Sequence, residues 1–389
     1  MGDVSQARYR RDPAGPHGRW EHPGLPGIPR PTSHRARPDQ GRHAFCPFII
    51  DGRNGRAGDV DELEVRAGAV AVRRRQGRSS HRSHALSRNE LEAVSRRYMQ
   101  EMIPFVGPHT DIMGPDMGTN EQIMAWFMDT YSVYMGYAVN EIVTGKPVAI
   151  GGTEGRREAT GRGAVYLIER AMNILKMNPE KCTAIVQGFG NVGSVAALSL
   201  AYKSGVKVVG ISDHTAAIYN PEGIDVKAAE QHMLKKGNLR AFAQDDHVDP
   251  RGFLTLPCDV LVPAAIDRVI TGKNAGQLKC RILAEAANGP TTPEADLILE
   301  NHWDEIFVIP DILCNAGGVI VSYFEWVQGL QAFLWSEMEV TDKLFRILEH
   351  SFAQVIRRAK EHRISHRTAA MAIGVERVIK AKQVRGLFP

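Results

Sequence analysis

Residues 183–193 read TAIVQGFGNVG, and this stretch decides the fold. Its first five residues are mostly apolar and predict a buried strand, while the last six predict a turn that opens a helix. A GxGxxG string in that context indicates a dinucleotide-binding site. We expect Gly188 to permit the tight turn, Gly190 to let a pyrophosphate approach the backbone, and Gly193 to let the helix pack on the strand.

An acidic residue follows at the place where the ribose of such a dinucleotide would bind. Asp213 ends the second predicted strand, 25 residues after Gly188, close to the roughly 20 residues expected for this role. Its carboxylate would accept hydrogen bonds from the 2′-hydroxyl and repel a 2′-phosphate, so NAD is favoured over NADP. Neighbouring His214, or an arginine from elsewhere, could still accommodate a phosphate, so NADP stays open.

After Gly145 short apolar strands alternate with helices, which predicts a parallel sheet with crossover helices. The expected strands are Thr183–Gln187, Lys207–Ser212, Val260–Pro263, 282–285 and 306–310. A helix is expected over residues 192–204, and the C-terminal region is predicted to be helical. Its apolar stripe consists of Leu344, Leu348, Phe352, Val355 and Ile356. The predicted fold class is α/β, a Rossmann-like doubly wound parallel sheet with a helical C-terminal segment.

Two further helices are predicted ahead of this unit. Ser87 and Glu90 have the spacing of a capping box before a helix over residues 88–103. Thr119 and Gln122 repeat that spacing before a second, apolar helix.

Residues 1–86 differ in composition from the rest of the chain. They contain 16 arginines and no lysine, and the first lysine of the protein is Lys146. The segment is rich in Arg, Pro, Gly, Ser and His and has no sustained periodicity, so we predict that it is disordered.

The whole-chain composition indicates an ordinary globular protein, with 43% apolar and 24% charged residues and a net charge of +4. No apolar run approaches the roughly 20 residues of a membrane span, and no signal peptide is evident, so a cytoplasmic location without membrane contact is expected. The five cysteines are far apart and form no CxxC pair. They predict neither disulfides nor a metal site, but reduced and mostly buried thiols.

Several motifs resemble, in order and spacing, those of the Glu/Leu/Phe/Val dehydrogenases. They are PDMGTNE at 115–121, TGKP at 144–147, REATGRG at 157–163, QGFGNVG at 187–193 and NAGGV at 315–319. The resemblance covers residue 85 to the C-terminus, and SYFEW at 322–326 is similar to the glutamate dehydrogenase branch. It implies oxidative deamination of L-glutamate to 2-oxoglutarate and ammonia, with hydride transfer to NAD(P), in a protein that assembles as a homohexamer.

The resemblance also implies roles for two residues at the substrate. Asp116 matches the aspartate that handles protons during imine formation and hydrolysis, a role that suits a buried carboxylate near a reacting amine. Ser322 matches the hydroxyl that contacts the side-chain carboxylate of the substrate. Without the family, Asp116 would be a loop aspartate that caps the next helix, and Ser322 an interior helical serine bonded to its own backbone.

Four residues match cofactor contacts of the family. Thr160 and Asn191 correspond to residues at the nicotinamide end and the phosphates, and Asn288 and Asn315 are expected to line the nicotinamide cleft. Taken alone, Thr160 would be a helix-cap residue and Asn191 part of a turn. The resemblance divides the chain into an aberrant segment (1–86), a remnant of the substrate-binding domain (87–145), a nucleotide-binding domain (146–335) and C-terminal helices packing back on the domain interface (336–389).

The N-terminal segment departs from the family. Members carry three lysines there: two bind the substrate carboxylates, and one polarises the carbonyl and activates water. In place of the last, residues 63–75 read LEVRAGAVAVRRR. When plausible high-GC codons for this string are read in a neighbouring reading frame, they encode a segment like PFGGAKGG. Residues 40–43, treated in the same way, give KGG. We hypothesise that residues 1–84 are an out-of-frame translation of a substrate domain, and we expect this chain to bind NAD weakly and to show no glutamate turnover.

Three alternatives remain open at this stage. The first is a leucine- or phenylalanine-type dehydrogenase, against which Ser322 and Trp326 argue. The second is a non-catalytic nucleotide-binding protein that regulates an intact partner. The third is nucleic-acid binding through the arginine-rich arm, which lacks the lysines and interleaved aromatic residues typical of such arms, so no nucleic-acid partner is expected.

Overall fold

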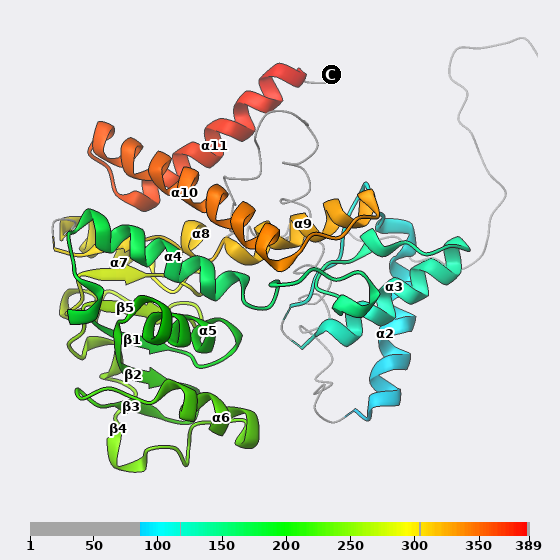
Figure 1. The fold of residues 1–389 in the computed structure, drawn as a ribbon. Helices are drawn as coiled ribbons and strands as arrows, with labels where there is room; N and C mark the ends of the chain where they lie inside the picture. The colour runs from blue at the N-terminus through cyan, green and yellow to red at the C-terminus, as the bar shows by residue number, and fades with distance from the viewer. Residues whose placement is uncertain (1–85, 117, 303–304, 387–389) are drawn as a thin grey trace, which may run out of the picture. The chain divides into compact units, whose positions relative to one another are not determined.

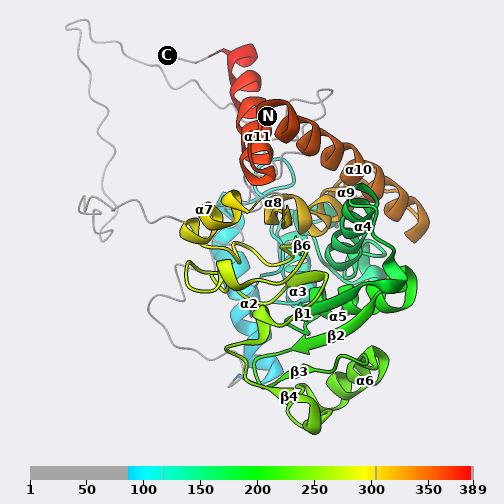
Figure 2. The same ribbon diagram turned by 90° about the vertical axis from the view of Figure 1, so that its left-hand side faces the viewer.

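The computed structural model describes residues 86–116, 118–302 and 305–386. Figures 1 and 2 show the arrangement of its helices and strands. The disorder predicted for residues 1–86 falls outside this part of the chain, apart from Leu86, and so do the out-of-frame hypothesis and the arginine-rich arm.

The described chain begins with α2 (Arg88–Met102), capped as the sequence predicted. The Ser87 side chain accepts a hydrogen bond from the Glu90 amide, and the Glu90 carboxylate accepts one from the Ser87 amide at 2.8 Å. This reciprocal pair fixes the start of the helix because it satisfies two amides that have no partner within the helix.

The second helix, α3 (Glu121–Met135), is capped by a different residue from the one predicted. Asn120 is the N-cap, and its side-chain oxygen accepts from the Ile123 amide at 3.1 Å. The capping box predicted at Thr119 is wrong because the Thr119 hydroxyl contacts the preceding turn instead, where it accepts from the Asp116 amide at 2.7 Å.

Seven strands form one sheet in the described residues, in the order β4-β3-β2-β1-β5-β6-β7, and Figure 1 shows β5 to β4 in this succession. The parallel strands are β1 (Thr183–Gln187), β2 (Lys207–Ser212), β5 (Val260–Pro263), β6 (Ile282–Ala284) and β7 (Phe307–Ile309). They pair side by side from β2 through β1, β5 and β6 to β7. The predicted parallel core is confirmed, although β6 and β7 are shorter than expected.

Two edge strands were missed by the sequence analysis. They are β3 (Ala217–Tyr219), antiparallel to β2, and β4 (His247–Val248), antiparallel to β3. Runs of three and two residues are too short to show the alternation that identifies a strand. The sheet is therefore mixed rather than wholly parallel.

Side chains of the central strands alternate between two hydrophobic cores. In β1, Ala184 and Val186 face one core while Ile185 faces the other, as the two-residue period of a strand requires. The first core is covered by α4 (Ala159–Ile174), α5 (Asn191–Ser199) and α6 (Val226–Lys236). The second core is covered in part by α7 (Pro293–Asn301). Figure 2 shows α5 and α6 on one side of the strands and α7 on the other.

The C-terminal region is helical, as predicted. Its helices are α8 (Asp311–Cys314), α9 (Gly317–Gln331), α10 (Glu337–His362) and α11 (His366–Arg385). Four members of the predicted stripe on α10 are buried, and Ile356 packs against them half-buried. The helix predicted over residues 192–204 is divided: α5 ends at Ser199 and a wider π-helical turn continues to Ser204.

The cysteines in the described residues are buried and free, as the sequence predicted: Cys182, Cys258, Cys280 and Cys314. Burial raises the pKa of the Cys280 thiol to about 12, so this thiol stays protonated near neutral pH and is a poor nucleophile. Cys46 lies outside the described residues.

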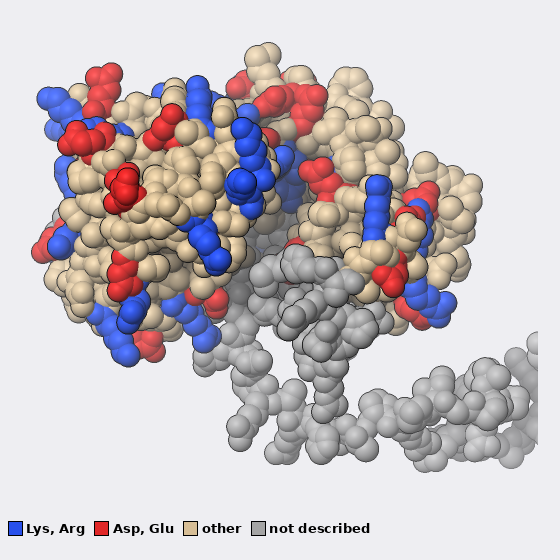
Figure 3. Space-filling view, turned by 90° about the horizontal axis from the view of Figure 1, so that it is seen from below, with Lys and Arg blue, Asp and Glu red and all other residues tan. Residues whose placement is uncertain are grey.

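The surface carries both signs of charge. Figure 3 shows lysine and arginine side chains interspersed with aspartate and glutamate over one face of the molecule. None of the helices in the described ranges is long and apolar enough to cross a membrane.

Candidate functional site

The turn after β1 has a geometry that requires glycine at two positions. Gly188 has a φ of +92°, in the left-handed region. A Cβ on Gly193 would lie 1.7 Å from the Gly188 carbonyl oxygen, so α5 can approach β1 only with glycine there. A Cβ on Gly190, in contrast, would meet no atom within 4 Å. The turn is therefore tight on its inner side and open at Gly190.

The open side of the turn is the beginning of α5. Gly190 is the N-cap, and no side chain of the described residues caps this end of the helix. Asn191, the first residue of the helix, is exposed. Uncapped amides and the positive end of the helix dipole favour an anion. The turn thus fits the pyrophosphate of a dinucleotide.

The beginning of α4 lies close to both α5 and α9. A Cβ on Gly161 would be 2.8 Å from the Val192 carbonyl oxygen, and a Cβ on Gly318 would be 2.6 Å from the Thr160 hydroxyl. These glycines allow the three helix ends to approach each other. They bring Thr160 to the start of α9 and next to the turn that contains Asn191.

The two asparagines predicted to line the nicotinamide cleft are in direct contact. The Asn315 side-chain amide donates to the Asn288 side-chain oxygen at 2.5 Å. Asn315 is the C-cap that follows α8, and Asn288 belongs to the loop after β6. Because both follow carboxyl ends of parallel strands, they lie at the edge where open α/β sheets bind ligands.

Asp213 is held by its own surroundings. One carboxylate oxygen accepts from the Thr215 amide and hydroxyl and from the Ala216 amide, and the other accepts from the Leu239 amide at 2.8 Å. Burial alone would raise the pKa of Asp213, but these hydrogen bonds outweigh it and lower the pKa. The carboxylate is thus ionised at neutral pH and shapes the turn after β2.

Asp116 is exposed in this structure, whereas the sequence analysis expected a buried carboxylate. Its neighbour Pro115 packs on Gly145, where a Cβ would lie 2.7 Å from the Pro115 ring. Ser322 is buried in α9, with 3% of its surface exposed. It lies one helical turn before Glu325, which accepts a hydrogen bond from the Gly145 amide, next to the place where Pro115 packs.

Glu325 forms a buried ion pair with Lys146. Their side chains are both 0% exposed, and the Nζ and Oε1 atoms are 2.6 Å apart. The Gly145 amide donates to the other Glu325 oxygen at 2.9 Å, and Lys146 Nζ also donates to the Val143 carbonyl at 3.2 Å. The side chain of Lys146, the first lysine of the chain, is therefore buried and bound to Glu325.

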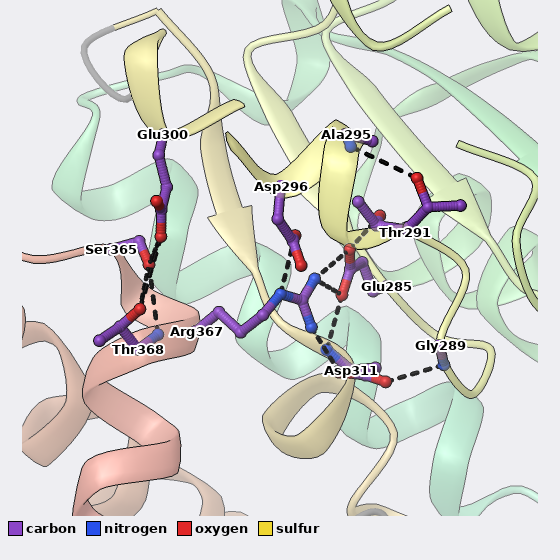
Figure 4. A network of polar contacts seen from close by, with 11 residues as sticks. Glu285, Gly289, Thr291, Ala295, Asp296, Glu300, Asp311, Ser365, Arg367 and Thr368 are labelled. Atoms are coloured by element: carbon purple, nitrogen blue, oxygen red, sulfur yellow. Dashed lines mark hydrogen bonds and ion pairs between the residues drawn. The ribbon is translucent and has the colours of Figure 1, made fainter. Parts of the chain in front are cut away.

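A cluster of one arginine and three carboxylates at the end of β6, which Figure 4 shows from close by, was not predicted from the sequence. Arg367 of α11 donates to both oxygens of Glu285 at 2.6 Å, to Asp311 at 2.7 Å and to Asp296 at 2.9 Å. Glu285 at the end of an apolar strand was the available signal, because a carboxylate there needs a partner. Its partner lies 82 residues later, too far to be recognised without the fold.

The protonation of the cluster reflects burial and excess negative charge. Burial raises the pKa of Glu285, Arg367 opposes this rise, and the nearby Asp311 carboxylate adds to it. The carboxylates in turn raise the pKa of Arg367 above its usual value, against the effect of burial. Arg367 is thus a permanent cation among three carboxyl groups.

The fold and this edge of the sheet define a Rossmann-type nucleotide-binding protein. The model of the Glutamate/Leucine/Phenylalanine/Valine dehydrogenase family matches residues 151–386, and that of the Glu/Leu/Phe/Val dehydrogenase dimerisation domain matches residues 76–133. The chain therefore belongs to this family, and its function is that of an amino-acid dehydrogenase of the glutamate dehydrogenase type.

Similar proteins of known name agree with this membership. A glutamate dehydrogenase of Thermotoga maritima is 46% identical over 304 residues, which are 78% of this chain and 73% of the relative. Glutamate dehydrogenase A2 of Halobacterium salinarum is 44% identical over 305 residues, with the same coverage of 78% and 73%.

Solved structures give the same result. The hetero-hexameric glutamate dehydrogenase of Thermus thermophilus in its Leu-bound form superimposes with a TM-score of 0.75 at 34% identity, over 88% of this chain and 81% of that one. The enzyme of Peptoniphilus asaccharolyticus gives a TM-score of 0.66 at 35% identity, over 78% and 72%.

Proposed function

We propose that this chain is built for the oxidative deamination of L-glutamate to 2-oxoglutarate and ammonia, with NAD as cofactor. The observation that carries the proposal is the open, uncapped turn at Gly190, which lies at the same edge of the sheet as Asn288 and Asn315. The bound cofactor would accept the hydride that leaves Cα of the amino acid. Within this proposal, residues 146–335 form the nucleotide-binding domain and residues 336–389 the helices that return to it.

The cofactor residues divide by the part of the dinucleotide that each would hold. Gly188, Gly190 and Gly193 shape the turn for the pyrophosphate, and the amides at the start of α5, beginning with Asn191, would bind it. Thr160, Asn288 and Asn315 would hold the nicotinamide end.

Asp213 supports NAD as the preferred cofactor. Its lowered pKa keeps a negative charge next to the ribose position, and that charge disfavours a 2′-phosphate. Its oxygens already accept four hydrogen bonds, so discrimination would rest on repulsion more than on a bond to the 2′-hydroxyl.

At the substrate, Ser322 would donate a hydrogen bond to the side-chain carboxylate of glutamate. Asp116 would take up and return protons as the imine forms and is hydrolysed. The Asp116 side chain is exposed in the described residues.

We further propose that the chain as it stands turns over poorly. The family lysines have no counterpart before Lys146, and Lys146 is held by Glu325. Loss of acid-base assistance costs about 10² to 10⁴ in rate, and loss of a charge that stabilises the developing oxyanion costs about 10² to 10³. Binding of NAD should survive, because the residues proposed for it all lie beyond residue 145.

A fluorescence titration of the full chain tests the cofactor proposal. We expect NADH to bind more tightly than NADPH, and Gly190→Asp to weaken NADH binding about tenfold or more, because a carboxylate there would repel the pyrophosphate. Gln383→Glu, which adds the same charge at an exposed position on α11, is the matched control and should bind normally. Failure of the unchanged chain to bind either nucleotide would overturn the assignment.

A glutamate-dependent assay tests the proposal that the chain turns over poorly. We expect no measurable reduction of NAD by this polypeptide with L-glutamate, L-leucine or L-phenylalanine. Rapid turnover with any of them would contradict the proposed impairment.

Assembly and location complete the proposal. The Thermus thermophilus relative is described as hetero-hexameric, and we propose that this chain belongs to a hexameric type of enzyme that works in the cytoplasm. Mass photometry of the purified chain would measure its assembly, and fractionation of expressing cells its location.

A further inference from the structure

The loop that follows β6 is attached to the sheet edge at two points. The Gly289 amide donates to the Asp311 carboxylate at 2.8 Å, and the Thr291 hydroxyl donates to Glu285. Asn288, proposed at the nicotinamide end, lies between Glu285 and Gly289 in the sequence, directly before the first attached residue. The position of its side chain therefore depends on Asp311 and Glu285.

Both attachment points are bound by the same arginine. Arg367 holds Asp311 through Nη1 and both oxygens of Glu285 through Nη2. Glu285 in turn accepts from the Asp311 amide at 2.9 Å. Figure 4 shows the guanidinium lying between these carboxylates and Asp296. One side chain from α11 thus joins the end of β6, α7 and α8.

A guanidinium suits this place for two physical reasons. Its donors lie in a fixed plane and can reach three carboxylates at once, which the single ammonium of a lysine cannot do with the same geometry. It also separates negative charges that would repel one another at short range in a buried site. Without it, Asp311 and Glu285 would have no cation between them in the described residues.

We propose that Arg367 is a positioning residue that sets the loop carrying Asn288, and through it the nicotinamide end of the cofactor site. This inference rests on the proposed NAD-binding function. Arg367 does not touch the cofactor; it acts through Asp311 and Gly289.

The docking of α11 does not depend on Arg367 alone. The Ser365 hydroxyl donates to Glu300 at 2.6 Å, the His366 ring bonds to the Val308 carbonyl at 2.8 Å, and Ala369 and Ala370 are fully buried. A substitution of Arg367 should therefore change the loop more than the attachment of the helix.

The test compares NADH with ADP-ribose, which has the pyrophosphate and both riboses but lacks the nicotinamide. We expect Arg367→Lys to raise the Kd for NADH about tenfold, the equivalent of one lost charged hydrogen bond, and to leave the Kd for ADP-ribose within about twofold. Arg377→Gln is the matched control, because it removes an arginine of the same helix that donates to Gln354 on α10. It should change neither value.

A second variant, Asp311→Asn, keeps the arginine and removes the charge that binds Gly289. It should show the same selective loss of NADH affinity, and it provides the test if Arg367→Lys proves unfolded by circular dichroism. Equal weakening of both ligands, or of neither, in the folded variants would overturn the positioning role. Failure of the unchanged chain to bind NADH and ADP-ribose would instead overturn the proposed function.

Discussion

The carboxylates that close β2 and β6 lie at the same edge of one sheet and are held in opposite ways. Asp213 is surrounded by amides and a hydroxyl, most of them from the next three residues, and its pKa is lowered. Glu285 is completely buried and bound to an arginine 82 residues later, and its pKa is raised. Local hydrogen bonds make the first turn largely self-contained, whereas the second depends on the docking of a distant helix.

The largest expected loss of stability comes from removing Glu285, which is bound by Arg367 of the distant helix α11. Glu285→Ala leaves Arg367 buried with incomplete compensation, and we expect it to lower the free energy of unfolding by about 3–5 kcal/mol. Urea denaturation followed by tryptophan fluorescence measures this change. Glu349→Ala, which removes a half-exposed partner of Arg170, is the control and should cost less than about 1 kcal/mol. Equal losses of unfolding free energy in the two variants would show that the buried ion pair stabilises the fold no more than an exposed one.

Removing the charge of Asp213, which is bound mostly by neighbouring residues, should lower the free energy of unfolding by less. Asp213→Asn keeps the shape of the side chain but removes one accepting oxygen and the charge, and we expect a loss of about 1.5–3 kcal/mol in unfolding free energy. The same denaturation experiment measures it. An unchanged midpoint would mean that the turn after β2 forms without its carboxylate.

The two sites should respond to pH with opposite signs. Because the folded pKa of Asp213 is lowered, its contribution to stability is present above its ordinary pKa of 3.8 and is lost as the pH falls through the lowered value. Because the folded pKa of Glu285 is raised, its contribution to stability is complete below its ordinary pKa of 4.5 and declines as the pH rises through the raised pKa.

Unfolding free energies of the variants across this pH range measure the difference. The deficit of Asp213→Asn relative to the unchanged protein should widen as the pH rises, while that of Glu285→Gln should narrow. Slopes of the same sign would refute the contrast between the two carboxylates.

The smallest effect is expected at the periphery of the arginine cluster. The Asp296 side chain is 23% exposed, so Asp296→Asn should cost less than about 1 kcal/mol while Arg367 keeps its two inner partners. Thermal unfolding is sensitive enough to measure this change. A loss as large as that of Glu285→Ala would remove the distinction between buried and outer partners.

Features that depend on neighbouring residues were predictable from the sequence. The glycine-rich turn after β1, the five parallel strands and the cap at Ser87 each follow from a short stretch of sequence. The family motifs added candidate residues such as Thr160 and Ser322, which no local pattern would have selected.

What the sequence did not predict depends on contacts between distant segments or on small competing bonds. Arg367 and Glu285 meet only because α11 returns to the sheet edge. Asn120 replaced Thr119 as the cap of α3 because the threonine hydroxyl bonds to an earlier turn. The burial expected for Asp116 is wrong for the described residues: its neighbour Pro115 packs on Gly145, while the Asp116 side chain is exposed.

The buried pair between Lys146 and Glu325 has a consequence for anyone who would splice a substitute substrate domain onto this chain. The fusion point should lie before Gly145. A fusion point after Lys146 would replace this lysine and leave the Glu325 carboxylate of α9 buried without its cation. Ser322 lies one helical turn from that carboxylate, so a fusion point placed after Lys146 would also disturb the surroundings of Ser322.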